Sequence, residues 1–310
     1  MRRSLVGSKG NRLVVLAYHN VEGTWCWPMK AGNGVAALTR QLRFLRRTTT
    51  VVPLEESLRA LAEGRPLPSR AVALTFDDGY RDNLTLAAPV LRRLGLPATV
   101  YLVPGFLTGE VHAWWERLGW AIRLARVPSF EFDGRQFALS EPQDRITALD
   151  AVEAGLKKRD HDARHAGVEA LVEVLDPAGG YHPDELFLDW DGARGLVDAG
   201  ISIGSHTMRH AILAREAAES QRADLRESRR LLQERLDIPV DTLAYPNGGR
   251  DDYDEATIAA AREGGYSHAV TTWGASSSAA TPAYEIRRKM AGTDRRAARL
   301  TAGVLRDLVS

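Results

Sequence analysis

The amino-acid sequence predicts an α/β protein, a distorted (β/α) barrel of seven or eight units with a mostly helical insertion on one loop. Two observations lead to this prediction. Short apolar runs alternate with longer amphipathic segments along most of the 310 residues, which is typical of parallel strands covered by helices. The seven or eight strand–helix units are enough to close a sheet into a barrel.

The predicted strands are short, apolar and rich in β-branched residues, as expected for strands that are buried on both faces. The run LVVLAY marks the first strand and the run AVALTF the third. The full set of predicted strands is 12–19, 49–54, 71–76, 98–103, 201–206, 242–246, 267–272 and 284–290.

The segments between these strands carry apolar residues at helical spacing. Several of them end at a glycine, such as Gly95 and Gly200, which is the usual residue after a helix. The longest segment alternates charges and is predicted to be a solvated outer helix of the barrel. The predicted helices are 36–47, 84–95, 190–200, 214–236 and 254–265.

One region, at about 105–188, breaks the alternation and is predicted to be a cap inserted into a single barrel domain that spans 1–310. It contains helical patterns at 112–125 and 143–159 and a strand-like piece at 129–139.

Three tryptophans of the insertion, Trp114, Trp115 and Trp120, allow two interpretations. Either they stack on the sugar rings of a glycan, or they attach the cap to the barrel.

Composition and charge exclude several classes of function. The 41 basic and 40 acidic residues give a net charge of +1, so no overall field attracts nucleic acid or an anionic membrane. The single cysteine, Cys26, excludes an internal disulfide and is typical of a reducing compartment. The apolar run 13–18 is too short for a signal-peptide core or a membrane span. These features predict a cytoplasmic protein.

Two adjacent carboxylates, Asp77 and Asp78, directly follow the predicted strand 71–76. Barrels of this class place catalytic groups at the carboxyl ends of their strands. Neighbouring side chains on an extended chain point in different directions, so one carboxylate can bind a metal while the other faces water. Asp-Asp-Gly is also common in ordinary turns, and this motif alone leaves both interpretations open.

A second motif, 205-SHTMRH-210, places His206 and His210 four residues apart at the end of another predicted strand. On a helical turn, this spacing puts both imidazoles on one face, as a divalent metal requires. Two histidines and one carboxylate leave a coordination position open, which is typical of catalytic zinc-type sites. Because strand ends of one barrel converge in space, the two motifs together predict a metal site.

These motifs resemble those of the polysaccharide deacetylases (carbohydrate esterase family 4). The family motif T-F-D-D-G is matched by residues 75–79, and H-[S/T]-x-x-H is matched by residues 206–210. The segment 16-LAYHNV-21 at the first predicted strand is also similar to the corresponding segment of family members. The resemblance covers about 12–104 and 188–290 and leaves the insertion uncovered.

The resemblance implies a barrel in which Asp77 is the general base of an amide hydrolysis. It also implies that Asp78, His206 and His210 bind Zn²⁺ or another divalent metal, such as Co²⁺ or Ni²⁺. Residues beside the motifs and on the insertion are the candidates for substrate binding. They are Tyr80, Thr207, Tyr245, Pro246, Asn247, Trp114 and Trp115.

The chain departs from the family pattern at two positions. The third motif commonly reads R-x-P-[F/Y]-G, but this chain has Ala244 in place of the arginine. The last motif commonly ends in histidine, but here it ends in Arg288, which is predicted to tether Asp77 instead. Because an arginine hardly gives up its proton, His19 at the end of the first strand is the candidate general acid. The alternative for His19 is a structural role in the core.

Two further features leave open interpretations. His268 lies inside a predicted strand and is the only other histidine singled out. The amphipathic segment 291–310 either contacts a membrane surface peripherally or packs on the barrel.

The sequence therefore predicts a metal-dependent N-deacetylase that acts on an N-acetylated sugar or glycoconjugate, without a nucleic-acid partner. The expected location favours a nucleotide-linked, lipid-linked or small-molecule glycoside. One alternative is a deformylase or another non-sugar amidase on the same barrel. The other is a non-catalytic glycan-binding homologue, which the two departures from the family pattern favour.

Overall fold

The computed structural model describes residues 11–28, 30, 32–293 and 295–309. Eight strands form one sheet, seven of them in the order β10-β1-β3-β4-β7-β8-β9, while β2 pairs with β3. All of these pairs are parallel. The strands are β1 Leu13–Tyr18, β2 Thr50–Val51, β3 Ala71–Phe76, β4 Thr99–Leu102, β7 Ser202–Ser205, β8 Thr242–Ala244, β9 His268–Val270 and β10 Arg288–Met290.

The sheet nearly closes on itself, which confirms the predicted distorted barrel. Val270 at the end of β9 forms a parallel bridge with Ile286, two residues ahead of β10. Strands β1 and β3 pair along their whole length and are buried throughout. Their shared register places the residues that follow them, His19 and Asp77, at the same end of the barrel, where the N–H of Asp77 donates to the carbonyl of Tyr18 over 2.9 Å.

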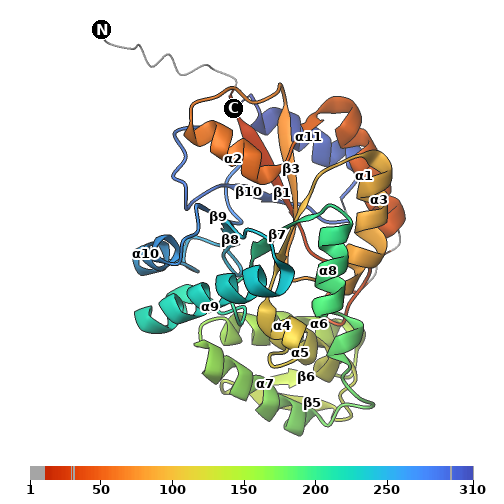
Figure 1. Ribbon diagram of the computed structural model, residues 1–310. Coiled ribbons are helices and arrows are strands. Elements are labelled where there is room, and N and C mark those ends of the chain that lie inside the picture. The colour runs from red at the N-terminus through yellow and green to blue at the C-terminus, as the bar shows by residue number, and fades with distance from the viewer. Residues whose placement is uncertain (1–10, 29, 31, 294, 310) are drawn as a thin grey trace.

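Helices surround this sheet (Figure 1). The helices of the barrel, together with the short α4 at the start of the insertion, are α1 Val35–Thr48, α2 Leu54–Ala62, α3 Ala88–Leu94, α4 Pro104–Thr108, α8 Trp190–Asp198, α9 Ala218–Leu236, α10 Glu255–Glu263 and α11 Ala297–Asp307. A π-helical turn, Asn83–Ala87, precedes α3, and short 3₁₀ turns occur at Pro183–Glu185 and Leu213–Arg215.

Several of the sequence predictions need correction, among them the predicted strand 284–290, which is a strand only at Arg288–Met290. The predicted strand 49–54 is a strand only at Thr50–Val51, and an unpredicted helix, α2, begins at Leu54. The reason is Pro53, which has no N–H for a strand ladder and stands as the cap of the helix. The helix α9 is not solvated all round, because Asp224 and Ser228 on its inner face are buried against the barrel.

The C-terminal helix α11 packs against α1, with Leu300 and Val304 buried in the main core. The apolar residues of this helix therefore pack on the barrel. Contact of the segment 291–310 with a membrane surface stays a prediction. Within the described part of the chain, no helix combines the length and the apolar character needed to cross a bilayer.

The insertion between β4 and β7 forms a cap at one end of the barrel, seen in the lower part of Figure 1. Trp114, Trp115 and Trp120 are buried in a second hydrophobic cluster, which also includes Cys26 and Tyr80 from outside the cap. The helix α7 was not predicted, because two of its buried positions carry the polar residues His161 and Arg164 and break the apolar pattern in the sequence. The elements of the cap are α5 Trp114–Arg123, β5 Ser129–Phe132, β6 Arg135–Ala138, α6 Pro142–Leu156 and α7 His161–Leu175.

Candidate active site

The chain turns sharply directly after β3, and this turn places Asp77 and Asp78 in different surroundings. Asp78 and Gly79 both have a φ of 73°. A Cβ on Gly79 would lie 2.7 Å from Cδ2 of Leu102, and together with the positive φ this contact favours glycine. A left-handed backbone costs a residue such as Asp78 about 1–3 kcal/mol, and such strain is concentrated at functional sites.

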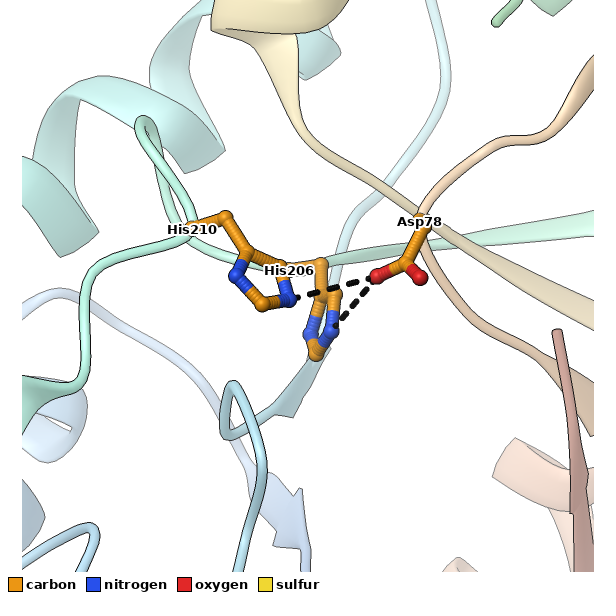
Figure 2. Close-up of side chains that lie close together, drawn as sticks. All are labelled: Asp78, His206 and His210. Carbon is orange, nitrogen blue, oxygen red and sulfur yellow. Dashed lines mark ion pairs between the residues drawn. The ribbon is translucent and has the colours of Figure 1, made fainter. Parts of the chain in front are cut away.

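Two imidazoles reach Asp78 from the loop that follows β7 (Figure 2). Oδ1 of Asp78 lies 3.3 Å from Nε2 of His206 and 3.3 Å from Nε2 of His210. The loop is not the helical turn that the spacing predicted. Thr207 and His210 have φ values of 66° and 54°, and the chain bends back so that both rings face the same carboxylate.

These three side chains fit a divalent metal. They are buried, and their possible ligand atoms lie within 4.8 Å of one another. Oδ1 of Asp78 is buried and accepts no hydrogen bond, which is costly unless a cation compensates it. Nδ1 of His206 lies 2.8 Å from the carbonyl oxygen of Ala244. As a donor, this nitrogen fixes the tautomer that leaves Nε2 free to bind a metal. One carboxylate and two imidazoles form a zinc-type donor set.

The protonation of His210 also suits a metal ligand. Burial lowers the pKa of His210 to about 4. The imidazole is therefore neutral near pH 7, as metal binding requires.

Asp77 is held by a fully buried arginine, as predicted. The two terminal nitrogens of the Arg288 guanidinium, Nη1 and Nη2, each donate to one oxygen of the Asp77 carboxylate over 2.7 Å, in a bidentate pair. Nε of Arg288 donates to the carbonyl of Thr271 over 2.9 Å. Burial by itself raises the pKa of Asp77, but the Arg288 guanidinium outweighs it, and the net pKa is lowered. Asp77 is therefore ionised at neutral pH.

His19 lies in the same cavity as Asp77, Asp78, His206 and His210. This cavity has a volume of about 920 Å³, near the upper end of the range of about 300–1,000 Å³ that is typical of ligand pockets. The side chain of His19 is only partly buried, and it lies within electrostatic reach of both carboxylates. The structure thus places His19 in the site rather than in the core, and its role as an acid stays a prediction.

The candidate substrate-binding residues divide into two groups. Asn247, Trp114 and Trp115 line the cavity, although only 3 % of Trp114 and 5 % of Trp115 is exposed. The other four are buried and lie outside the cavity lining. They are Tyr80, Thr207, Tyr245 and Pro246.

Two of the buried candidates, Tyr80 and Tyr245, are held by contacts with other side chains. The hydroxyl of Tyr80 donates to Glu116 over 2.8 Å and accepts from Nε1 of Trp115 over 2.9 Å. The ring of Tyr245 stacks on Tyr253 at a centroid distance of 4.4 Å. For the tryptophans of the cap, burial agrees with the interpretation that they attach it to the barrel.

Carboxylates that no motif marks hold the loop after β1 over the site. Asp82 accepts hydrogen bonds from the N–H groups of Val21 and Glu22, over 2.7 and 2.9 Å. Glu116 of the cap accepts from the N–H of Cys26 over 3.0 Å. These partners are backbone groups far away in the sequence, so residue spacing carries no signal for them.

A third such carboxylate, Asp224 of α9, holds the loop between the two histidines. Its Oδ1 accepts a hydrogen bond from the N–H of Met208 over 2.6 Å, and its Oδ2 lies 3.5 Å from Nε of Arg209. Only 2 % of the Asp224 side chain is exposed, and burial raises its pKa to about 6.

Replacing Asp224 with alanine is expected to weaken Zn²⁺ binding about ten- to a hundredfold, because the loop loses the acceptor that fixes the positions of His206 and His210. Titration calorimetry with Zn²⁺ measures this change. Glu219→Ala, on the exposed face of the same helix, is the matched control and should bind Zn²⁺ like the wild type. Equal affinity in Asp224→Ala would show that the loop keeps its shape without this carboxylate.

Comparison with known proteins identifies relatives of this chain. A family model described as polysaccharide deacetylase matches residues 64–131 and 143–269. This match extends into the inserted cap, which the resemblance of the motifs had left uncovered.

Two curated proteins share parts of the sequence. The Bacillus subtilis protein YxkH, whose name places it with the polysaccharide deacetylases, is 23% identical over 270 residues, which are 85% of this chain and 66% of YxkH. The poly-β-1,6-N-acetyl-D-glucosamine N-deacetylase of Escherichia coli O157:H7 is 33% identical over 104 residues, 31% of this chain and 15% of that protein. The chain therefore spans just under two thirds of YxkH and a much smaller share of the second protein.

Two solved structures share the fold. The deacetylase PplD of Streptococcus pyogenes, solved with acetate bound, has a TM-score of 0.63 at 17% identity, over 95% of this chain and 99% of that one. IcaB from Ammonifex degensii has a TM-score of 0.61 at 18% identity, over 95% and 97% of the two chains.

Proposed function

This chain belongs to the polysaccharide deacetylase family, and we propose that it is a metal-dependent hydrolase that removes the N-acetyl group from an acetamido sugar. One observation carries the proposal: the buried group of Asp78, His206 and His210 shares a cavity with the carboxylate that Arg288 holds. The name of the Escherichia coli relative, which refers to an N-acetylglucosamine polymer, supports the substrate class.

Asp78, His206 and His210 would hold the metal, with Zn²⁺ as the first candidate and Co²⁺ or Ni²⁺ as others. A divalent cation supplies Lewis acidity, which lowers the pKa of water and polarises an amide carbonyl. The protein contributes a buried, pre-oriented donor set, because the carbonyl of Ala244 fixes the tautomer of His206.

Asp77 would accept a proton from the attacking water. The bidentate pair with Arg288 fixes the carboxylate in position, and the lowered pKa keeps it ionised. An oriented base of this kind typically contributes a factor of about 10²–10⁴ to the rate.

His19 would donate a proton to the leaving amine. An imidazole can do this near neutral pH, whereas the guanidinium of Arg288 cannot. Its position at the end of β1, in the cavity shared with Asp77, supports this role.

The proposal includes a cytoplasmic location, supported by the single cysteine, Cys26. Residues 1–10, which carry the basic start of the chain, lie outside the described residues. The intact pair of Asp77 with Arg288 and the complete donor set support an enzyme over a non-catalytic glycan-binding homologue.

Acetate release by zinc-loaded protein, measured over a panel of acetamido sugars and glycans, tests this function. We expect release from at least one substrate, its loss when a chelator removes the metal, and its return when Zn²⁺ is added. Formate release from N-formylated analogues, without acetate release, would instead indicate a deformylase. Glycan binding without any hydrolysis by metal-loaded protein would indicate the non-catalytic alternative.

A further inference from the structure

An exposed tryptophan lies in the cavity that contains the candidate metal centre. Trp27 is 44 % exposed and lines this cavity, with its ring centre 6.0 Å from that of His19. Among the described residues, no other tryptophan, tyrosine or phenylalanine lines the cavity with comparable exposure, since Trp114 and Trp115 are almost fully buried. An exposed indole in a ligand cavity offers a flat apolar face to whatever binds there.

The cap holds the chain around Trp27 in place. Residues 24–27 form a tight turn, in which the N–H of Thr24 donates to the carbonyl of Trp27 over 2.8 Å. Within this turn, the N–H of Cys26 donates to the carboxylate of Glu116 on α5. Gly119 of the same helix makes room for the turn, because a Cβ there would lie 2.9 Å from the nitrogen of Cys26. An indole on a turn that is already held costs little conformational entropy when a ligand binds.

The side chains around Trp27 fit a sugar better than a protein partner. Ile146 of α6 also lines the cavity and is 42 % exposed, but these two apolar side chains stand singly and do not form the wide patch of a protein interface. The carboxylate of Asp150 lines the same cavity and can accept hydrogen bonds from sugar hydroxyls. A pyranose ring needs both features, an apolar surface for its C–H face and acceptors for its hydroxyls.

The charges of the cavity lining disfavour a nucleotide diphosphate. Nε of Arg123 donates to the carbonyl of Trp25, and Lys157 pairs with Glu153 at 3.4 Å. Of the three described lysine and arginine side chains that line the cavity, Arg123 and Lys157 are therefore already engaged, and Lys30 is the third. The carboxylate of Glu22 adds further negative charge to the lining, and negative charge repels a pyrophosphate.

We propose that Trp27 forms a sugar-binding subsite, in which its indole stacks on the pyranose ring next to the one whose acetamido group is hydrolysed. This inference rests on the proposed function and narrows it to glycans of two or more rings. In this inference the aromatic side chain that stacks on the sugar is Trp27 of the loop after β1, and not Trp114 or Trp115, which are buried.

The test compares zinc-loaded wild type, Trp27→Ala and Trp27→Phe on N-acetylglucosamine, its β-1,6-linked tetramer and a nucleotide-linked N-acetylglucosamine. We expect Trp27→Ala to raise KM for the tetramer about tenfold or more, with a much smaller effect on the single sugar, so that the preference for the longer substrate is lost. Trp27→Phe should restore most of it. Phe44→Ala removes an aromatic side chain that is 39 % exposed on α1, outside the cavity, and should change neither substrate.

A second readout, independent of turnover, is calorimetric binding of the tetramer to each protein in an Asp77→Asn background. If the wild type hydrolyses the tetramer and Trp27→Ala keeps its KM and affinity, the subsite is refuted and the proposed function stands. A loss confined to the nucleotide-linked sugar also refutes it. If no protein releases acetate, the proposed function fails. In that case, weaker tetramer binding by the Trp27→Ala protein would still support the subsite. Equal binding by both proteins, or no binding at all, would refute the subsite.

Discussion

Asp77→Asn is expected to lower kcat by about 10²–10⁴-fold, while the protein stays folded and still binds metal. The carboxamide is nearly the same size as the carboxylate, but it cannot accept a proton from water. Asp78, His206 and His210 are unchanged in this variant, so Zn²⁺ titration should give the wild-type stoichiometry. Single-turnover acetate release, measured beside metal content, checks both parts.

The same substitution leaves Arg288 with a weaker partner in a fully buried position. Disrupting a buried pair can cost about 3–5 kcal/mol, so some loss of thermal stability is expected. Asp133→Asn is the matched control, because its salt bridge to Arg159, at 2.7 Å, is on the surface, where such pairs contribute about 0–1 kcal/mol. Turnover of Asp77→Asn within a factor of two of the wild type would rule out Asp77 as the base.

Arg288→Lys separates the tether from the base. Lysine keeps the positive charge but cannot form the bidentate contact. The variant should therefore stabilise the ionised form of Asp77 less well against burial, and the pKa of Asp77 should rise. Since the base works only when it is ionised, the acidic limb of the kcat/KM profile should move to higher pH than in the wild type. A pH profile that superimposes on the wild type would show that Arg288 does not control the ionisation of Asp77.

His206→Ala is expected to weaken Zn²⁺ binding more than about a hundredfold and to lose activity in parallel, because a direct ligand should matter more than its supporting contacts, which are worth about 10–100-fold. Metal content after dialysis and Zn²⁺ calorimetry measure this. His268→Ala is the matched control, since His268 lines a separate small cavity with Glu55 and Asp241. Full metal occupancy in His206→Ala would contradict the proposed ligand set.

The parts of the site that could be predicted from the sequence are those written as local motifs. Asp77 and Asp78 follow a strand whose apolar run is plain, and the end of a barrel strand leads to the centre of the site. Arg288 lies 211 positions from Asp77, and its role was accessible only through the family pattern.

Contacts between side chains and distant backbone groups could not be predicted. Asp82, Glu116 and Asp224 each accept hydrogen bonds from backbone N–H groups, which every residue except proline offers, so no residue type marks the partner. The backbone conformation of the loop 206–210 could not be predicted either. The four-residue spacing of its histidines is compatible with a helical turn, and only the left-handed residues of the structure exclude that turn.

Exposure was the least predictable property. The neighbouring tryptophans of the cap, Trp114 and Trp115, were candidates for sugar contact but are buried, whereas Trp27, which no motif marks, is exposed in the cavity. Residue type alone does not decide which aromatic side chains complete a core and which remain at the surface.

The contact between Gly119 and the turn at Cys26 bears on how this protein can be redesigned. The cap between β4 and β7 and the loop after β1 are separate in the sequence, but each is shaped against the other. A chimaera that receives a foreign cap without the matching loop would lose Glu116, so the N–H of Cys26 would lack its acceptor and the position of Trp27 would be unsupported. The two segments are therefore one unit for engineering, to be exchanged together when a different ligand specificity is wanted.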